Sequence, residues 1–436
     1  MKVRDRAFKI LRISHSLKQK GFYSIFVSQI INNILLFGTS VLVVRLINKE
    51  DFGRYSYAYN IISLFLLING IGMLSGFLQF GSEFSDDKVK SSAYEKYAFK
   101  TGIIASISIS VIIMGLVKFG NNSINQSSIL LLLLSLIPIF HFAYTFFETK
   151  FRVLEMNKKY SLLINLNSIT YFVSVIIGSV FMNVVGIILA KYLAYSISII
   201  YGIYSFKKSN RHIVSKESYH LDKIEKKEFL KLSVITAFNN AISQMLYLID
   251  VFIIGLILVD TSIIASYKTA TIIPFALNFI PTSIMIFIYP KYAKNNRNLE
   301  YIRKYTKQII GLLLVGNLFI SIFLVVFSKN IVYLLFGIEY GDSIKPFIIL
   351  SICYFISGTF RIPFGNILFS MKRVKFNLFV SILTGLVNII LNYLLITKYG
   401  SIGASYTTIS VYLLSSLLSV TYFLRVTRKG AFEIEQ

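Results

Sequence analysis

Apolar segments of about 20 residues alternate with short polar connections along nearly the whole chain. A helix of that length crosses the ~30 Å hydrocarbon core of a bilayer, so each segment is a predicted membrane-spanning helix. Twelve such helices are predicted, at residues 22–46, 54–80, 98–119, 128–147, 161–181, 184–206, 229–258, 262–289, 306–327, 347–370, 376–397 and 402–425. The pattern therefore predicts an all-α membrane protein.

The first and seventh predicted helices are both polar on one face. Gln29 and Asn33 share a face of the first helix at the 3.6-residue period, and Asn240 and Gln244 share a face of the seventh. Such a stripe faces either a water-filled path or a neighbouring helix to which it hydrogen-bonds. Both interpretations stay open: the four side chains line a substrate path, or they join helices.

A short motif suggests that the chain is built from two similar halves. FGRYSYA at 52–58 and IASYKTA at 264–270 place small, tyrosine and alanine residues in the same order. Both halves start on the same side of the membrane, so the repeat is parallel, about an axis along the membrane normal. We predict a six-helix lobe at 1–206 that begins with a basic interfacial segment at 1–21, a cytoplasmic linker at 207–228, and a second six-helix lobe at 229–436.

Composition and charge agree with a multi-pass membrane protein. Hydrophobic residues make up 55% of the 436 positions and charged residues 15%, and the mean hydropathy is +0.67. The net charge of +25 lies mainly in alternate connections: 33 of the 45 Lys and Arg fall on one side and seven on the other. This asymmetry predicts that both termini and the basic loops are cytoplasmic. The basicity therefore indicates topology and contact with anionic lipid, not a nucleic-acid partner.

The sequence lacks the signatures of several kinds of catalytic and binding site. The connections are too short for a soluble catalytic domain, and no nucleotide-binding loop of the form G-x-x-x-x-G-K-[ST] is present. Cys353 is the only cysteine, which excludes an intrachain disulfide and a thiolate metal site. We therefore expect a transporter without catalytic residues, bound metal or cofactor.

Charged side chains inside apolar segments are costly, and they are the first candidates for function. Asp250 and Lys268 lie at similar depth in a predicted hairpin that turns near Asp260. Arg361 lies ~20 Å into the tenth helix, near the bilayer centre. His141 occupies the comparable depth in the fourth helix.

The buried cations outnumber the buried acids. Lys191, Lys268 and Arg361 are opposed only by Asp250 among deeply placed acids, so a shared cavity would favour an anion such as a diphosphate. Lys191 either snorkels outward or faces that cavity. Asp250 either pairs with Lys268 or couples H⁺ or Na⁺ movement. An interior-negative membrane potential would also help to export an anion, by ~2.3 kcal/mol per charge per 100 mV.

Prolines mark predicted bends in two helices. Pro274 and Pro281 interrupt the eighth helix, and Pro363 follows Arg361 in the tenth. Proline removes a backbone donor and frees carbonyl groups that need other partners.

The fifth and sixth helices meet within a few residues around Asn183.

The C-terminal run resembles a known family. NILFSMKRVKFNLFVSILTGLVNIILNYLLITKYGSIGASYTTISVYLLSSLLSV, at 366–420, is similar to polysaccharide transporters of the multidrug/oligosaccharidyl-lipid/polysaccharide exporter superfamily, in particular O-antigen flippases. The matching residues are Asn388, Leu391, Asn392, Tyr393, Tyr399, Gly400, Gly403 and Ala404. RLINKEDFGRYSYA, ASYKTA, IYPKYA and LFGIEYGDSIKP also look like family features.

The resemblance implies two six-helix lobes around a central cationic cavity in a bacterial inner membrane. It implies alternating access that moves an undecaprenyl-diphosphate-linked oligosaccharide, an O-antigen or related repeat unit, to the outer leaflet. Expected partners are a polysaccharide polymerase and chain-length machinery. The family holds its cavity cations in no fixed motif, so the assignment of Arg361, Lys268, Lys191 and His141 to substrate binding rests on their depth alone.

Two alternatives remain. A cation-coupled multidrug exporter of the same superfamily is disfavoured because the first helix has no carboxylate and cavity cations would repel cationic drugs. A membrane polysaccharide polymerase or glycosyltransferase is disfavoured because the predicted external loops are the short ones.

Overall fold

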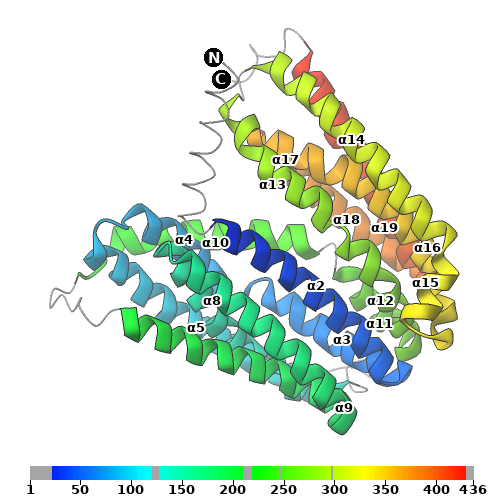
Figure 1. The fold of residues 1–436 in the computed structure, drawn as a ribbon, viewed down its shortest axis with the longest axis horizontal. Helices are drawn as coiled ribbons and strands as arrows, with labels where there is room; N and C mark the ends of the chain where they lie inside the picture. The colour runs from blue at the N-terminus through cyan, green and yellow to red at the C-terminus, as the bar shows by residue number, and fades with distance from the viewer. Residues whose placement is uncertain (1–21, 120–126, 210–218, 246–247, 296–297, 429–436) are drawn as a thin grey trace. The chain divides into compact units, whose positions relative to one another are not determined.

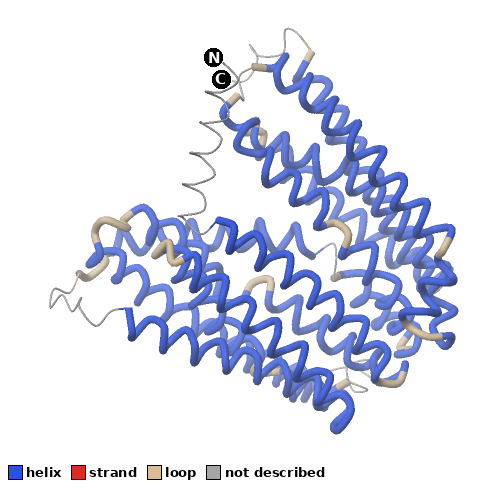
Figure 2. Tube along the Cα trace, viewed as in Figure 1, coloured by secondary structure: helices blue, strands red, loops and turns tan. Residues whose placement is uncertain are grey.

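The computed structural model describes residues 22–119, 127–209, 219–245, 248–295 and 298–428. Helices account for almost all of these residues, and none of them lies in a β-strand (Figure 2). The predicted interfacial segment at 1–21 and the middle of the predicted linker at 207–228 lie outside the described residues. The prediction of an all-α membrane protein is confirmed.

The helices are labelled in Figure 1. Those of the first half are α2 (Phe22–Leu46), α3 (Lys49–Leu66), η1 (Asn69–Gly72), α4 (Met73–Glu83), α5 (Lys88–Phe119), α7 (Ser128–Leu134), α8 (Ile137–Val153) and α9 (Asn157–Ser209). Those of the second half are α10 (Lys223–Met245), α11 (Ile249–Leu258), α12 (Thr261–Ala276), α13 (Phe279–Lys294), α14 (Leu299–Val326), α15 (Ser328–Leu335), η2 (Ile338–Ser343), α16 (Ile344–Ile356), η3 (Ser357–Arg361), α17 (Ile362–Ser370), α18 (Val374–Tyr399) and α19 (Ser401–Thr427).

Ten helical stretches among the described residues are long and apolar enough to cross a membrane. One of them, α9, contains two predicted crossings, because its backbone leaves the helical region at Asn183, where φ is 54° and ψ is −133°. The predicted seventh helix at 229–258 is not continuous: α10 ends at Met245, and α11 is a separate short apolar helix. α10 is not one of the ten apolar stretches, because it contains many polar and charged residues.

The predicted proline bends are confirmed. α12 ends two residues after Pro274, α13 begins two residues before Pro281, and α17 starts with Pro363 in its first turn. The first turn of a helix tolerates proline because its N–H groups have no partner within the helix.

A second kind of break uses glycine. Between α3 and α4 the backbone takes positive φ at Gly70, Ile71 and Gly72. A Cβ atom on Gly70 would lie 2.6 Å from the Phe142 ring, so this turn needs glycine for both its dihedral angles and its packing.

Contacts within the chain divide it into two compact units. Unit 1 takes Met1–Ile47 and Ile61–Ala241, and unit 2 takes Asn48–Asn60 and Ile242–Gln436. Helices α3 and α10 therefore each contribute to both units. The lobes predicted from the sequence are each one continuous stretch of the chain, and their boundaries stay a prediction.

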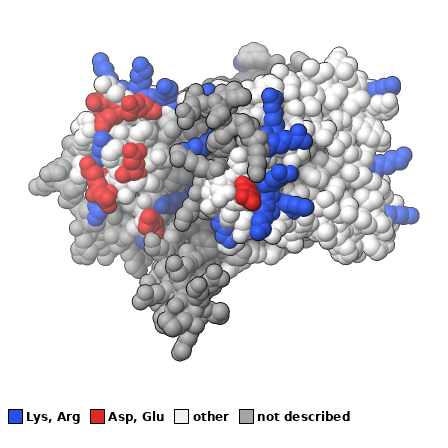
Figure 3. Space-filling view, turned by 90° about the horizontal axis from the view of Figure 1, so that it is seen from above, with Lys and Arg blue, Asp and Glu red and all other residues white. Residues whose placement is uncertain are grey.

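The predicted inner connections meet at one end of each unit. In unit 1 a buried cluster joins Phe77, Tyr94, Val153, Leu221 and Phe229, which come from or border three of these connections. In unit 2 the equivalent cluster joins the ends of α13, α14, α17 and α19. Lys and Arg side chains gather in groups on the face seen in Figure 3, beside broad areas that carry no charge. The predicted cytoplasmic orientation of the basic connections stays a prediction.

An ion pair fixes the start of α10 within unit 1. Lys90 Nζ lies 2.8 Å from Glu225 Oε1 and 4.1 Å from the centre of the Phe84 ring. The hydrogen bond from Lys90 lowers the pKa of the Glu225 carboxyl. Phe229, one helical turn further on, packs against the rings of Phe80 and Tyr94.

The same tight helical hairpin occurs once in each unit. Gly400, between α18 and α19, has φ 61° and ψ −142°, close to the values at Asn183. A Cβ atom on Gly186, three residues after Asn183, would lie 1.9 Å from the Gly178 carbonyl oxygen. A Cβ atom on Gly403, three residues after Gly400, would lie 2.0 Å from the Leu395 carbonyl oxygen. In both hairpins the partner carbonyl lies five residues before the turn.

This close backbone approach gives a testable prediction. Gly186→Ala should lower the free energy of unfolding by about 1–3 kcal/mol, because the new methyl group meets backbone that cannot move aside alone. Thermal unfolding of the purified protein in detergent measures the effect. Gly115→Ala in α5 is the control, since nothing lies within 4 Å of its Cβ position. Equal melting temperatures for the two variants would show that the hairpin is not so tightly packed.

Candidate functional site

A buried carboxylate in unit 2 is surrounded by neutral hydrogen-bond donors. Asp250, 2% exposed, accepts bonds from the Tyr267 hydroxyl at 2.9 Å and from the Thr408 hydroxyl at 2.6 Å. The amides of Asn388 and Asn392 donate to it at 3.3 and 2.7 Å. These partners come from α12, α18 and α19, so one carboxylate joins four helices of the unit.

One atom of this cluster lacks a partner. Asn392 donates its amide to Asp250 and to Asn388 Oδ1, but its own Oδ1 is buried without a hydrogen bond. An orphaned acceptor beside a buried carboxylate creates a negative site that a proton or a cation would stabilise. Asn388 and Asn392 belong to the motif of spaced asparagines in the sequence, although the sequence did not indicate that they contact Asp250.

The predicted proximity of Asp250 and Lys268 does not produce an ion pair among the described residues. Within the part of the chain that the structure describes, all hydrogen-bond partners of Asp250 are neutral, and the half-buried Lys268 ammonium group has no hydrogen-bond or ion-pair partner. Lys268 is one residue after Tyr267 in α12, so its side chain leaves the helix in another direction.

Arg361 lies at the end of a π-helical turn, η3. The Ile362 N–H donates to the Ser357 carbonyl five residues earlier, just before Pro363. The proline ring would clash with the Thr359 carbonyl in a regular α-helix, and the wider turn relieves that clash. The guanidinium carbon of Arg361 lies 4.7 Å from the centre of the Tyr412 ring of α19. The turn therefore sets the direction in which Arg361 leaves its helix.

A buried amide of α14 supports this turn. Asn317, 2% exposed, accepts from the Tyr354 hydroxyl at 2.8 Å and donates to Thr359 Oγ1 at 3.3 Å. Gly358 makes room for it, because a Cβ atom there would lie 2.9 Å from Asn317 Nδ2. Sequence reasoning did not single out Asn317, since one asparagine in an apolar helix carries no pattern.

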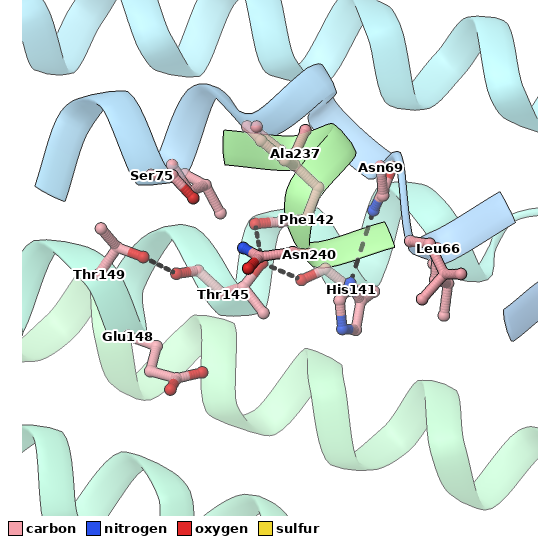
Figure 4. A pocket seen from close by; sticks show the side chains of 13 residues that line it. Leu66, Asn69, Ser75, His141, Phe142, Thr145, Glu148, Thr149, Ala237 and Asn240 are labelled. Atoms are coloured by element: carbon pink, nitrogen blue, oxygen red, sulfur yellow. Dashed lines mark hydrogen bonds between the residues drawn. The ribbon is translucent and has the colours of Figure 1, made fainter. Parts of the chain in front are cut away.

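Unit 1 contains a polar cavity of about 260 Å³. Figure 4 shows His141, Thr145 and Glu148 on one face of α8, with Asn69 from η1 and Asn240 from α10 across from them. The structure thus brings together two predicted site residues, His141 and Asn240. Glu148 is a third functional candidate that the sequence-based list of site residues lacked, although its spacing of seven from His141 places both on one helix face.

Two hydrogen bonds fix the His141 side of the cavity. The Asn69 amide donates to the Pro138 carbonyl at 2.9 Å and lies 3.5 Å from His141 Nδ1. Asn69 Oδ1 is buried without a hydrogen-bond partner. The break at η1 therefore supplies the cavity with an open acceptor.

The other predicted polar residues of unit 1 lie apart from this cavity's lining. Gln29 Nε2 donates to the Tyr160 hydroxyl at 3.4 Å, which in turn donates to Glu148 Oε1 at 3.4 Å. Asn32 accepts from the Ser168 hydroxyl of α9, whereas Asn33 is exposed. Lys191 Nζ lies 4.9 Å from the centre of the Tyr171 ring. Part of the α2 stripe thus joins helices, and Gln29 also connects to Glu148.

Gln244 is exposed near the end of α10.

Among the described residues, no group of three His, Cys, Asp or Glu side chains is placed to hold a metal ion.

Comparison with known proteins identifies the family. A family model described as "Polysaccharide biosynthesis protein" matches residues 19–296, more than half of the chain. The chain belongs to this family. The capsular polysaccharide biosynthesis protein CapF of Staphylococcus aureus is 25% identical over 418 residues, which span 93% of this chain and 98% of that protein.

Solved structures share the fold. An inward-facing multidrug resistance MATE family transporter of the MOP superfamily aligns with a TM-score of 0.72 at 13% identity, over 92% of this chain and 96% of that one. The lipid II flippase MurJ in an inward closed conformation aligns with a TM-score of 0.72 at 16% identity, over 92% and 89%. This member of the polysaccharide biosynthesis family is therefore a multi-pass membrane protein with the fold of these transporters.

The Asp250 cluster predicts a strong effect on stability. Asp250→Ala removes the acceptor of four buried donors, and an unsatisfied buried group costs about 1–3 kcal/mol. We expect a loss of at least about 2 kcal/mol in unfolding free energy, and a smaller loss for Asp250→Asn, which keeps one acceptor oxygen. Thermal unfolding in detergent measures both, with Asp86→Ala, an exposed carboxylate, as the control. Unchanged melting of Asp250→Ala would contradict the described geometry.

The Asn317 network predicts energetic coupling. Asn317→Ala and Tyr354→Phe each remove one partner of the same hydrogen bond, so each should cost about 1 kcal/mol or more. The double variant should lose less than the sum of the two, by about 0.5–1.5 kcal/mol. A double-mutant cycle of thermal unfolding measures this difference. Strict additivity would show that the bond does not form.

Proposed function

We propose that this protein is a flippase that moves a lipid-linked oligosaccharide from the cytoplasmic to the outer leaflet by alternating access. Family membership carries the proposal: the match is to polysaccharide biosynthesis, while the fold is that of transporters. A biosynthetic family with a transporter fold fits a step that moves an intermediate, not one that forms a glycosidic bond.

The substrate we propose is an undecaprenyl-diphosphate-linked repeat unit of a surface polysaccharide such as O-antigen. The diphosphate would be held by Arg361, with Lys268 as a further cation of unit 2, and Lys191 of unit 1 stays a predicted substrate contact. Arg361 has a fixed direction from the π turn and the Tyr412 ring, and Lys268 is a half-buried cation without a found partner. Planar guanidinium groups bind phosphate through two parallel hydrogen bonds, which an ammonium group cannot do.

Asp250 would serve as the site that couples transport to H⁺ or Na⁺. Its four neutral donors and the orphaned Asn392 oxygen leave a buried negative charge without a balancing cation among its described partners. Export of the anionic diphosphate would also gain from an interior-negative membrane potential. Both contributions would drive transport without ATP.

The proposed setting is the bacterial inner membrane, with both termini cytoplasmic and a polysaccharide polymerase and its chain-length machinery as partners. A cation-coupled multidrug exporter is the second candidate, because the MATE transporter and MurJ align equally well. The fold thus leaves the two open, and the family model favours polysaccharide export.

Deletion of the protein in its own strain tests the proposal. Surface polysaccharide should be lost while the lipid-linked repeat unit accumulates at the cytoplasmic face, and the wild-type chain should restore export. Arg361→Ala should fail to restore it, and Arg361→Lys should restore it only in part, since the charge stays but the bidentate geometry is lost. Mass spectrometry of extracted lipids measures the intermediate.

Arg303→Ala is the matched control, because Arg303 is an exposed arginine of α14. It should restore export like the wild type at equal expression. If the repeat unit of the deletion strain instead reaches the outer leaflet without being polymerised, the protein acts after the flipping step and the proposal is wrong.

A further inference from the structure

The cavity of unit 1 differs in chemistry from the cationic residues of unit 2. Its lining includes one acid, Glu148, together with hydroxyl and amide groups, and it has no Lys or Arg. A phosphate would be repelled by the Glu148 carboxylate. A different part of a substrate, or a different ligand, must therefore match this cavity.

The cavity presents more hydrogen-bond acceptors than donors. The Thr145 and Thr149 hydroxyls donate to the carbonyls of His141 and Thr145 in their own helix, which leaves only their lone pairs free. Asn69 Oδ1 has no donor, and Glu148 receives a single long bond from Tyr160. Buried acceptors without donors are costly, so a ligand rich in O–H or N–H groups would be bound favourably.

The donors that remain are few and well separated. With Asn69 donating toward His141 Nδ1, a neutral imidazole carries its proton on Nε2 and can donate into the cavity. Asn240 contributes an amide from α10, and Ser75 contributes a hydroxyl from α4. A few donors beside a larger number of acceptors suit a sugar ring, whose hydroxyl groups both donate and accept.

Size agrees with this assignment. A single water needs about 10–15 Å³ of such space, and typical small-molecule pockets start near 300 Å³. At about 260 Å³ the cavity is far larger than one ion requires and is close to the size of a small-ligand pocket.

We infer that the unit 1 cavity binds a sugar residue through Glu148, with His141, Asn69 and Asn240 completing the hydrogen bonds. This inference rests on the proposed function and deepens it: the glycan is read in unit 1, apart from the diphosphate contact in unit 2. The Glu148 carboxylate sets the selectivity. It favours an amino sugar whose ammonium group pairs with it, accepts a neutral hexose, and rejects a uronic acid.

A fluorescence titration tests the inference directly. The chain has no tryptophan, so Leu66→Trp places a single reporter in the cavity lining without background. The purified full-length variant is titrated with methyl glycosides of glucosamine, glucose and glucuronic acid, and separately with NaCl. We expect saturable changes whose apparent Kd rises in the order glucosamine, glucose, glucuronic acid.

Glu148→Gln in the Leu66→Trp background should raise the Kd for the glucosamine glycoside at least about tenfold, the change expected when a hydrogen bond to a charged group is lost. It should also bring the glucuronic acid Kd closer to that of glucose. Glu155→Gln, which alters an exposed carboxylate seven residues further along, should change neither value. Should Leu66→Trp fail to fold, Leu74→Trp lines the same cavity and carries the same titration.

Two results would overturn the inference. One is the absence of any saturable response to the glycosides, or a response that Glu148→Gln leaves unchanged. The other is a response to NaCl alone, which would make the cavity a cation site. Either result can occur while the deletion strain still accumulates the lipid-linked repeat unit, so failure of the sugar site and failure of the proposed function are distinguishable.

Discussion

A polar group inside the hydrocarbon of a membrane must find a partner within the protein, because no water is available to replace it. Where a helix of this protein breaks, at η1 or at the π turn before Pro363, a polar side chain forms a hydrogen bond beside the break: the half-buried Asn69 donates to the Pro138 carbonyl, and the buried Asn317 donates to Thr359. The Asp250 carboxylate follows the same rule with four donors from three neighbouring helices. Hydrogen-bonded polar clusters thus form at helix breaks and around buried charged side chains.

The same constraint leaves specific atoms without partners, and these point to ligands. Asn392 Oδ1 beside Asp250 and Asn69 Oδ1 beside His141 are both buried acceptors without donors. Each lies next to a carboxylate or an imidazole that can gain or lose a proton. The open acceptor in unit 2 is the reason for proposing a proton or cation there, and the polar cavity in unit 1 is the reason for proposing a hydroxyl-rich ligand there. With Arg361 as the proposed anion contact, the proposals assign anion, cation and glycan to groups of different chemistry.

The sequence was sufficient to predict an all-α membrane protein, because apolar segments of about 20 residues are typical of membrane-spanning helices. Proline positions also predicted correctly where α12 ends and where α17 begins. It was insufficient for the Asp250 cluster. Depth alone suggested Lys268 as the partner, but adjacent residues of a helix point about 100° apart, and the bond went to Tyr267 instead. Glu148 and Asn317 were missed for a related reason: a single polar residue shows its role only when the neighbouring helices are placed. The predicted lobe boundaries and site assignments stay predictions.

Movement of a lipid-linked oligosaccharide across a bilayer by this protein can be measured with purified components. Purified protein is reconstituted into liposomes that carry an undecaprenyl-diphosphate-linked oligosaccharide distributed randomly between the two leaflets. Membrane-impermeant periodate added outside then oxidises the sugars that are exposed in the outer leaflet. If the protein is a flippase, oxidation should proceed well beyond the half expected for static, randomly distributed lipid, and Arg361→Ala should abolish the excess. Oxidation that stops at the level of protein-free liposomes, with folded protein present, would contradict the proposal.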